Sequence, residues 1–275
     1  MKKLKHLYRR TLGRVLKRPN TLLVEPGNTV VLVASDGTRC QLVRPYRGLV
    51  IHCAGRDNYI EIAEGIHFEN SELRITGNNH TLIMAPTKRM VKNLAIDTWG
   101  SHHATITIGR NFQCAGFAAY ITMAHPTLTI GDDCLFAWNI NAWMGYPHAL
   151  INLKTGRAEE PKEKTLAIGS RVWVGYGVSF TKNVEIAEGS IIAAGSVITK
   201  DIGKPNSLAA GNPAQVKRQG VTWAYPMAEW YNAILDDDFS IEKLGLWNSL
   251  VERSHKDEVK ALKQSLKPKV NRRRA

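Results

Sequence analysis

Histidine side chains are the groups in this chain best suited to proton transfer near neutral pH, because an unperturbed imidazole has a pKa of about 6.5. His148 lies in a segment that begins at Gly145 and contains two prolines and several Lys-Glu pairs. Such a composition is typical of a loop, and a loop held by a rigid scaffold can present a side chain to a cleft. His148 is therefore a candidate for acid-base chemistry.

The cysteines offer no comparable chemistry. Cys40, Cys53, Cys114 and Cys134 are separated by 13, 61 and 20 residues, which matches no zinc or redox spacing. They are too sparse for a disulfide framework, so we expect buried free thiols in a reducing compartment. No cysteine or serine lies in a recognisable nucleophile motif, so a covalent acyl-enzyme is not expected.

The net charge of +13 arises at the two ends of the chain. Residues 1–18 contain eight Lys or Arg and residues 266–275 contain five, with no acidic residue in either, which leaves 24 basic against 24 acidic side chains between them. A nucleic-acid-binding protein usually carries its basic surface on the folded domain, so no nucleic-acid partner is expected. No apolar run approaches the roughly 20 residues of a membrane-spanning helix. The N-terminus also lacks the apolar stretch of a signal peptide, which predicts a cytoplasmic location.

A six-residue repeat begins at Ile168 and continues through six hexads. Large apolar residues recur every six positions, and a second set of small or β-branched residues follows each of them by four positions. The first set is Ile168, Val174, Phe180, Ile186, Ile192 and Ile198, and the second is Val172, Val178, Val184, Ser190, Ser196 and Ile202. This period fits neither a 3.6-residue helix nor a long alternating strand.

The repeat predicts a triangular prism in which each hexad forms one side and eighteen residues form one turn. Successive turns then stack as parallel strands about 4.8 Å apart, and no turn has a core of its own. The same pattern recurs less cleanly upstream, at Ile62, Ile108 and Ile130. The interval from Ile108 to Ile130 predicts one turn plus four residues, and that from Ile130 to Ile168 predicts two turns plus two. We expect the extra residues to bulge outward as loops, most clearly over 144–165.

The repeats resemble those of the hexapeptide-repeat acetyltransferases, closely over about 105–216 and loosely over about 45–104. The resemblance implies an all-β solenoid, a left-handed parallel β-helix. The sequences Trp173-Val-Gly, Ala194-Gly-Ser-Val-Ile-Thr-Lys-Asp and Ala210-Gly-Asn-Pro-Ala are similar to the acetyl-CoA-dependent branch. The segment from Gly145 to Asn152, followed by Lys154-Thr-Gly-Arg, is similar to the active-site loop of bacterial polysaccharide and sialic-acid O-acetyltransferases.

This resemblance implies that His148 is the catalytic base. It also implies that Trp173 lines the site, with its side chain pointing outward, and that Asn139, Asn141 and Tyr146 lie near the acceptor. Tyr146 is a departure, because the family commonly has an aspartate two residues before the histidine. Orientation of the imidazole would then pass to a backbone carbonyl or another side chain.

Acetyl-CoA is the co-substrate that the resemblance implies, with no metal. Gly175 and Ala194 would approach the pantetheine arm, with Trp173 beside it, and Lys200 and Arg218 would meet the phosphates. Related enzymes bind CoA between adjacent prisms, so a homotrimer is expected. The predicted activity is acetyl transfer to a hydroxyl of a bacterial surface carbohydrate, from a capsule, a lipopolysaccharide or a sialic acid, without an acyl-enzyme.

Three segments are expected along the chain. Residues 1–20 form a basic segment in which Leu4, Leu7, Leu12 and Val15 have helical spacing, and it could rest on the inner face of an anionic membrane. Residues 21–215 form the β-helix domain with the loop 144–165. Residues 216–275 form a helical extension with a basic tail.

Other activities remain open at this stage. The acceptor could be an amine of a sugar nucleotide, since a histidine base serves both acceptors. The same fold can bind zinc through three histidines, as in a carbonic-anhydrase-type hydratase, and His102, His103, His125 and His148 recur at intervals of 22–23 residues. A trimeric scaffold without catalytic activity is a further alternative.

Overall fold

The computed structural model describes residues 20–122, 124–145, 148–158, 165–181 and 183–223. The chain divides into two compact units, 1–222 and 223–275, and the description concerns the first. The described residues form strands and contain no helix, so none of them forms a helix that could cross a membrane. The helix predicted at the N-terminus and residues 224–275 of the helical extension predicted over 216–275 lie outside the described residues. Residues 216–219 belong to a strand, Ala214–Gln219, so the predicted boundary of the β-domain at 215 is wrong there.

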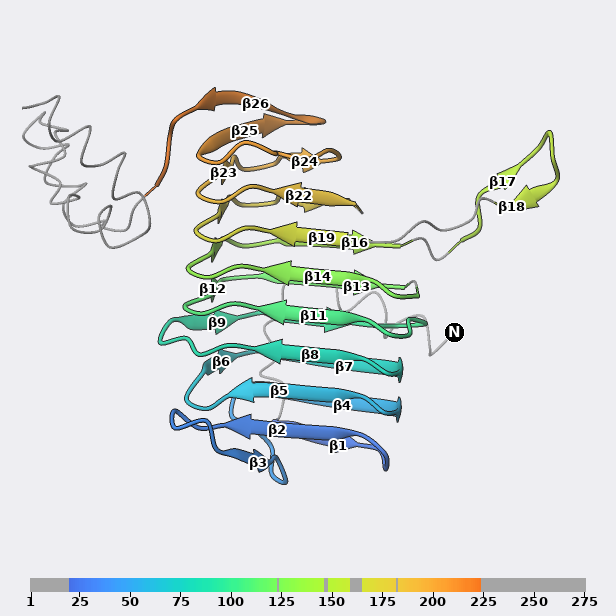
Figure 1. Cartoon of the computed structure of the whole chain (residues 1–275), viewed down its shortest axis with the longest axis vertical. Helices are drawn as coiled ribbons and strands as arrows, with labels where there is room; N and C mark the ends of the chain where they lie inside the picture. Colours follow the sequence, from blue (N-terminus) through green and yellow to red (C-terminus); the bar gives the residue numbers. More distant parts are fainter. Residues whose placement is uncertain (1–19, 123, 146–147, 159–164, 182, 224–275) are drawn as a thin grey trace, which may run out of the picture. The chain divides into compact units, whose positions relative to one another are not determined.

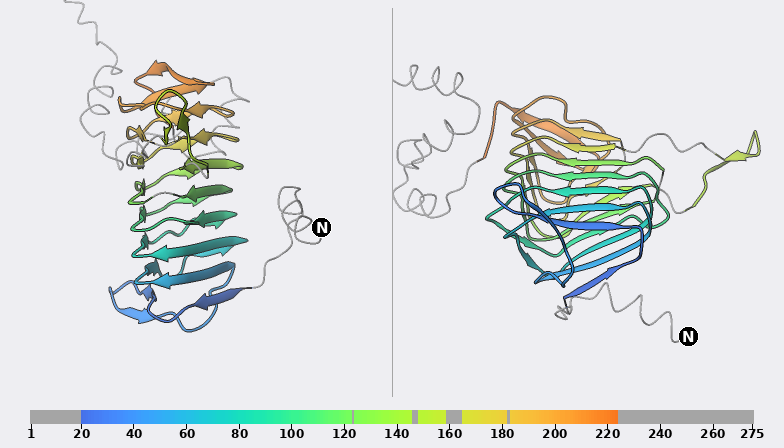
Figure 2. Two further views of the ribbon diagram at one scale, coloured as in Figure 1. Left: turned by 90° about the vertical axis from the view of Figure 1, so that its right-hand side faces the viewer. Right: turned by 60° about the horizontal axis from the view of Figure 1, so that its bottom comes forward.

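Three eight-stranded sheets form the described unit, and nearly all their strand pairs are parallel. We call them sheets I, II and III (Figures 1 and 2). Sheet I contains β1 (Thr21–Val24), β4 (Leu49–Arg56), β7 (Ser71–Asn78), β10 (Leu94–Asp97), β13 (Phe117–Ile121), β16 (Ile140–Met144), β21 (Ser179–Phe180) and β24 (Val197–Ile198).

Sheets II and III complete each turn. Sheet II contains β2 (Thr29–Val33), β3 (Arg39–Gln41), β5 (Tyr59–Ala63), β8 (Thr81–Met84), β11 (Thr105–Ile108), β14 (Thr127–Ile130), β19 (Thr165–Ile168) and β22 (Val184–Ile186). Sheet III contains β6 (His67–Glu69), β9 (Met90–Lys92), β12 (Gln113–Cys114), β15 (Leu135–Phe136), β20 (Trp173–Val174), β23 (Ile191–Ile192), β25 (Ser207–Gly211) and β26 (Ala214–Gln219). Within the described part of the chain, antiparallel pairs occur only at the two ends of the solenoid, β2 with β3 and β25 with β26, apart from a separate hairpin described below.

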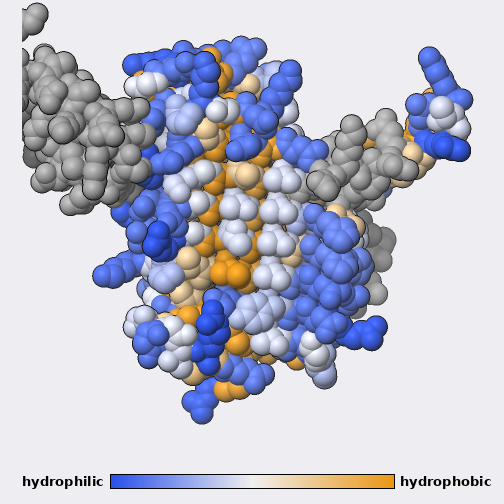
Figure 3. Space-filling model, viewed as in Figure 1, coloured by the Kyte–Doolittle hydropathy of each residue, from blue (hydrophilic) through white to orange (hydrophobic). Residues whose placement is uncertain are grey.

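The predicted inward positions of the hexads form the core. Both sets are buried throughout, from Val172 and Val174 to Ile198 and Ile202, including the serines of the second set, Ser190 and Ser196. Leu166 is the neighbour of Val184, and Trp173 that of Ile191, so these turns contain the predicted eighteen residues. The prediction of a parallel β-solenoid is confirmed. In Figure 3 the outward face of sheet II appears as pale columns, with threonine recurring in register at Thr81, Thr105, Thr127 and Thr165.

The turns before residue 145 are wider than the later ones, and the prediction that their extra residues form outward loops is wrong. Ile106 pairs with Leu128, 22 residues on, yet the additional residues lengthen sheet I and its corner with sheet II. The strand β13 buries Phe117, Ala119 and Ile121, three inward side chains. In the first narrow turn, two turns later, the same side buries only Val178 and Phe180. Extra apolar residues in phase with the strand therefore widen the core.

The interval of 38 residues is one turn, not the two turns predicted. Ile130 and Ile168 are direct neighbours on β14 and β19, so the residues between them close a single turn. The excess is an insertion between Met144 and Thr165. It leaves the solenoid where sheet I passes to sheet II, at the level where wide turns give way to narrow ones.

A polar ladder lines the inside of this corner in the wide turns. The amide of Asn58, which is 1% exposed, binds Asn28 and the carbonyl oxygen of Gly77. One turn later His80, also 1% exposed, accepts the Ala104 N–H at Nδ1 over 3.0 Å, which leaves Nε2 to donate to the Thr76 carbonyl at 3.1 Å. Burial lowers the pKa of His80. This histidine is a neutral structural group.

Candidate functional site

The insertion at the corner of sheets I and II holds the candidate base. His148 is exposed and lies four residues beyond Met144, the last residue of β16. Further along, β17 (Ile151–Asn152) and β18 (Arg157–Ala158) form a small antiparallel hairpin outside the three large sheets (Figure 1). Its turn is fixed by the Asn152 side chain, whose Oδ1 accepts the N–H groups of Lys154 and Thr155 at 2.9 and 3.2 Å.

Two other histidines stack at the same corner one and two turns earlier. The rings of His103 and His125 lie 4.7 Å apart and nearly parallel, and both residues adopt left-handed backbone conformations. His148 follows Met144 by four residues, as His125 follows Ile121, and Met144 and Ile121 are neighbours. Among the described residues, which include all four histidines of the zinc alternative, no group of three metal-ligating side chains comes together.

The corner of sheets III and I gathers several predicted contact residues. Asn139 occupies a left-handed position with φ of 58° and Asn141 follows on β16. Gly175 lies at the same corner one turn later, where a Cβ would stand 2.7 Å from the backbone nitrogen of Ala194. The glycine is thus required by the close approach of the next turn, and Ala194 is exposed beside it.

An apolar stripe on the outer face of sheet III connects two further predicted residues. Trp173 points outward as expected and is 39% exposed. Its neighbours in register are Ile191 and then Leu208, and Leu208 pairs with Arg218 on the last strand. Strands about 4.8 Å apart place the backbone of Arg218, three strands away, roughly 14 Å from that of Trp173.

The predicted residues do not all meet within one copy of the chain. His148 and the exposed Lys200 belong to the corner of sheets I and II, whereas Gly175, Ala194 and Asn139 lie at the corner of sheets III and I. Trp173 and Arg218 belong to sheet III, on the side that does not border the His148 corner. Tyr146 lies outside the described residues.

Sequence reasoning missed an aromatic pair near the insertion. Tyr120 on β13 and Trp143 on β16 stack on the outer face of sheet I with ring centroids 4.6 Å apart. The two residues are 23 positions apart, which is the length of one wide turn. Treating this interval as a structural period, instead of eighteen residues plus a loop, would have paired them.

Three of the four cysteines are unsuited to nucleophilic attack. Cys53, Cys114 and Cys134 are buried, and burial raises the pKa of the Cys53 thiol to about 11 and that of Cys134 to about 12. The expectation of buried free thiols is wrong for Cys40, which is exposed on the edge strand β3.

Comparisons with known proteins agree with the repeat pattern. Residues 167–200 match the family model "Bacterial transferase hexapeptide (six repeats)". The chain is 38% identical over 120 residues to galactoside O-acetyltransferase of Escherichia coli (strain K12), an alignment that covers 43% of this chain and 56% of that protein. The chain thus spans about half the length of this relative.

The solved structure of the polySia specific acetyltransferase NeuO is similar with a TM-score of 0.51 and 22% identity, over 79% of this chain and 100% of that one. At this identity the likeness bears on the fold alone. Together the matches confirm that the chain resembles the hexapeptide-repeat acetyltransferases.

Proposed function

We propose that this protein transfers an acetyl group from acetyl-CoA to a hydroxyl of a bacterial surface carbohydrate, with His148 as the general base. The observation that carries the proposal is the exposed His148 on an insertion that interrupts a hexapeptide-repeat solenoid. The alignment with a galactoside O-acetyltransferase supports a sugar hydroxyl as the acceptor. The fold alone would not, because one fold hosts many activities.

The reaction needs one proton transferred twice. A ring nitrogen of His148 takes the proton from the acceptor hydroxyl as its oxygen attacks the thioester carbonyl, and the new C–O bond forms. The C–S bond then breaks, and the imidazolium returns the proton to the departing thiolate. Because the acceptor oxygen attacks the thioester directly, no acyl-enzyme is required. Burial raises the pKa of the Cys53 and Cys134 thiols, which makes both poor nucleophiles.

The outer face of sheet III fits acetyl-CoA as a substrate. Its stripe offers the apolar surfaces of Trp173, Ile191 and Leu208 to the pantetheine arm and ends at the Arg218 guanidinium, which suits a phosphate. The small, exposed side chain of Ala194 leaves room at the adjoining corner. Lys200, on a different corner, would reach the phosphates only from another copy of the chain.

A homotrimer would bring these separated parts together. The His148 insertion leaves one corner of the solenoid while Trp173 lies on the opposite side, so a complete site needs a second copy. Mixed trimers of His148→Ala and Trp173→Ala chains should then recover activity that neither variant has alone. Random mixing gives an intact site about a quarter of the time, since each part is unaltered in half of the chains. A mixture as inactive as its components would mean that both residues act within one chain.

Thiol release from acetyl-CoA tests the activity itself. Wild type and His148→Ala are compared over a panel of acidic and neutral bacterial oligosaccharides, with acetyl-CoA binding measured in parallel. Loss of a general base reduces the rate by about 10²–10⁴-fold, while acetyl-CoA binding persists. Full activity in the variant would remove His148 from the mechanism, and absence of both acetyl-CoA binding and turnover in the wild type would end the transferase proposal.

A further inference from the structure

The stacked pair Tyr120 and Trp143 is an exposed aromatic surface that the proposed acetyl-transfer chemistry does not use. The two residues are direct neighbours on β13 and β16, with rings 19° from parallel. On the outer face of sheet I, Tyr120 is 36% exposed and Trp143 is 53% exposed. Large exposed aromatic surfaces of this kind commonly mark binding sites.

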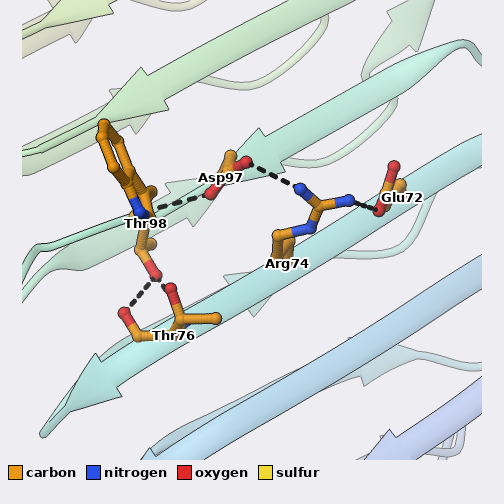
Figure 4. A network of polar contacts seen from close by, with 6 residues as sticks. Glu72, Arg74, Thr76, Asp97 and Thr98 are labelled. Carbon is orange, nitrogen blue, oxygen red and sulfur yellow. Dashed lines mark hydrogen bonds and ion pairs between the residues drawn. The ribbon is translucent and has the colours of Figure 1, made fainter. Parts of the chain in front are cut away.

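Polar side chains continue the same row across the sheet. Asp97 is the neighbour of Tyr120, and Arg74 is the neighbour of Asp97. Arg74 binds Asp97 at 3.5 Å and Glu72 at 2.7 Å, which fixes the guanidinium between two carboxylates (Figure 4). An aromatic surface beside fixed donors and acceptors is suited to a sugar, whose C–H faces are apolar and whose rim carries hydroxyl groups.

The free face of the Trp143 indole lies at a step in the solenoid. Tyr120 covers one face, and the next strand along the sheet, β21, ends at Phe180, the neighbour of Ala142. No β21 residue is therefore paired with Trp143. His148 follows five residues later, within about 18 Å along the chain, so a ligand on the indole would lie close to the insertion that carries the candidate base.

Charge on this face favours an uncharged ligand. Between β7 and β16 the described outward residues of sheet I carry two carboxylates, Glu72 and Asp97, and one guanidinium, Arg74. The excess negative charge would repel a polyanion such as an acidic capsule chain. Neutral hexose units avoid this penalty and can still bind the carboxylates through their hydroxyls.

We infer that Tyr120 and Trp143 form an acceptor subsite for a neutral oligosaccharide, which holds sugar units next to the one acetylated at the His148 insertion. This inference rests on the proposed function, because the bound sugar is an acceptor only if the protein acetylates it. Binding of the sugar to the two rings does not depend on catalysis. A second copy of the chain is a less fitting occupant, because an interface core is depleted in charge whereas the ion-paired network adjoins these rings.

Direct binding tests the subsite separately from activity. Maltoheptaose, cellohexaose and a galactan hexamer serve as neutral probes, and a sialic-acid hexamer serves as the acidic one, with calorimetry as the readout. We expect at least one neutral probe to bind. The substitutions Trp143→Ala and Tyr120→Ala should weaken this binding about tenfold or more, as for aromatic anchors that a ligand covers. Trp143→Phe should retain most of the affinity. Val43→Ala is the matched control, because Val43 follows β3 and is 75% exposed. This substitution should leave the affinity for the neutral probe unchanged.

Three results would overturn the subsite. They are binding of the acidic probe alone, no binding of any neutral probe to the wild type, or unchanged affinity in Trp143→Ala. Light scattering on the same variants provides the remaining check: a change in oligomeric state in Trp143→Ala would assign the rings to a subunit interface. Calorimetry measures binding of the neutral probe in the absence of acetyl-CoA and turnover, so a failure of the catalytic proposal would leave this measurement intact.

Discussion

Close approach between successive turns explains the glycine that follows the apolar residue in several repeats. Gly109, Gly131 and Gly169 stack at the corner of sheets II and III. A Cβ on Gly131 would lie 2.5 Å from the Ser170 nitrogen, and one on Gly169 would lie 2.8 Å from the Glu188 nitrogen. Replacing Gly169 by alanine therefore tests whether the stacking distance sets the residue type.

The cost follows from the geometry. The added methyl would also stand 3.0 Å from the Ile186 carbonyl oxygen, whereas ordinary contacts begin at 3.4 Å. That carbonyl accepts the Gly169 N–H at 2.8 Å, so the turns cannot separate without straining this hydrogen bond. Overpacking of this kind costs about 1–3 kcal/mol. At about 2–4 °C per kcal/mol for a domain of this size, Gly169→Ala should lower Tm by roughly 2–12 °C.

Gly203→Ala is the matched control. A Cβ there meets nothing within 4 Å, and its φ lies outside the left-handed region. Alanine at such a position changes stability by about 0.4–1 kcal/mol in the favourable direction, through the unfolded chain. Thermal unfolding at one protein concentration and one scan rate compares both variants with the wild type. An unchanged Tm for Gly169→Ala, or equal losses in both variants, would refute the reasoning from turn spacing.

Two further predictions concern buried groups. Because burial lowers the pKa of His80, the unfolded chain binds more protons than the folded one below about pH 6.5, so stability falls as the pH drops through that region. Thermal unfolding at about pH 8 and about pH 5.5 should show a smaller drop in His80→Asn than in the wild type, and an equal drop would contradict the neutral role. Iodoacetamide should modify the native protein once per chain, at the exposed Cys40, while the three buried thiols react only after unfolding. Mass spectrometry of the digested protein reads this directly, and rapid native labelling of Cys114 would contradict its burial.

The six-residue period predicted the three sheets because each hexad places one large and one small side chain inward. The wide turns escaped prediction because their extra residues continue the strand alternation, as Phe117, Ala119 and Ile121 do, and a count of hexads cannot distinguish a longer side from a loop. The loop over 144–165 was predicted, but the number of turns across it was wrong for a related reason: the insertion is close to one turn in length, so an interval of 38 residues was counted as two turns.

The candidate site was less accessible to sequence than the fold. The positions of His148 at one corner and of Trp173 on the opposite sheet follow from the number of turns across the insertion. Only the register of the strands gives that number. Gly175 and Asn139 show a second limit, since close packing and a left-handed φ explain both residue types without any ligand.

Transfer of radiolabelled acetyl from acetyl-CoA to a carbohydrate acceptor, compared between wild type and His148→Ala, tests the central claim most directly. The proposal predicts label in the oligosaccharide with the wild type and a loss of about 10²–10⁴-fold in the variant, with acetyl-CoA binding retained. Equal labelling by both proteins, or label that stays on the protein, would contradict direct transfer with His148 as the base.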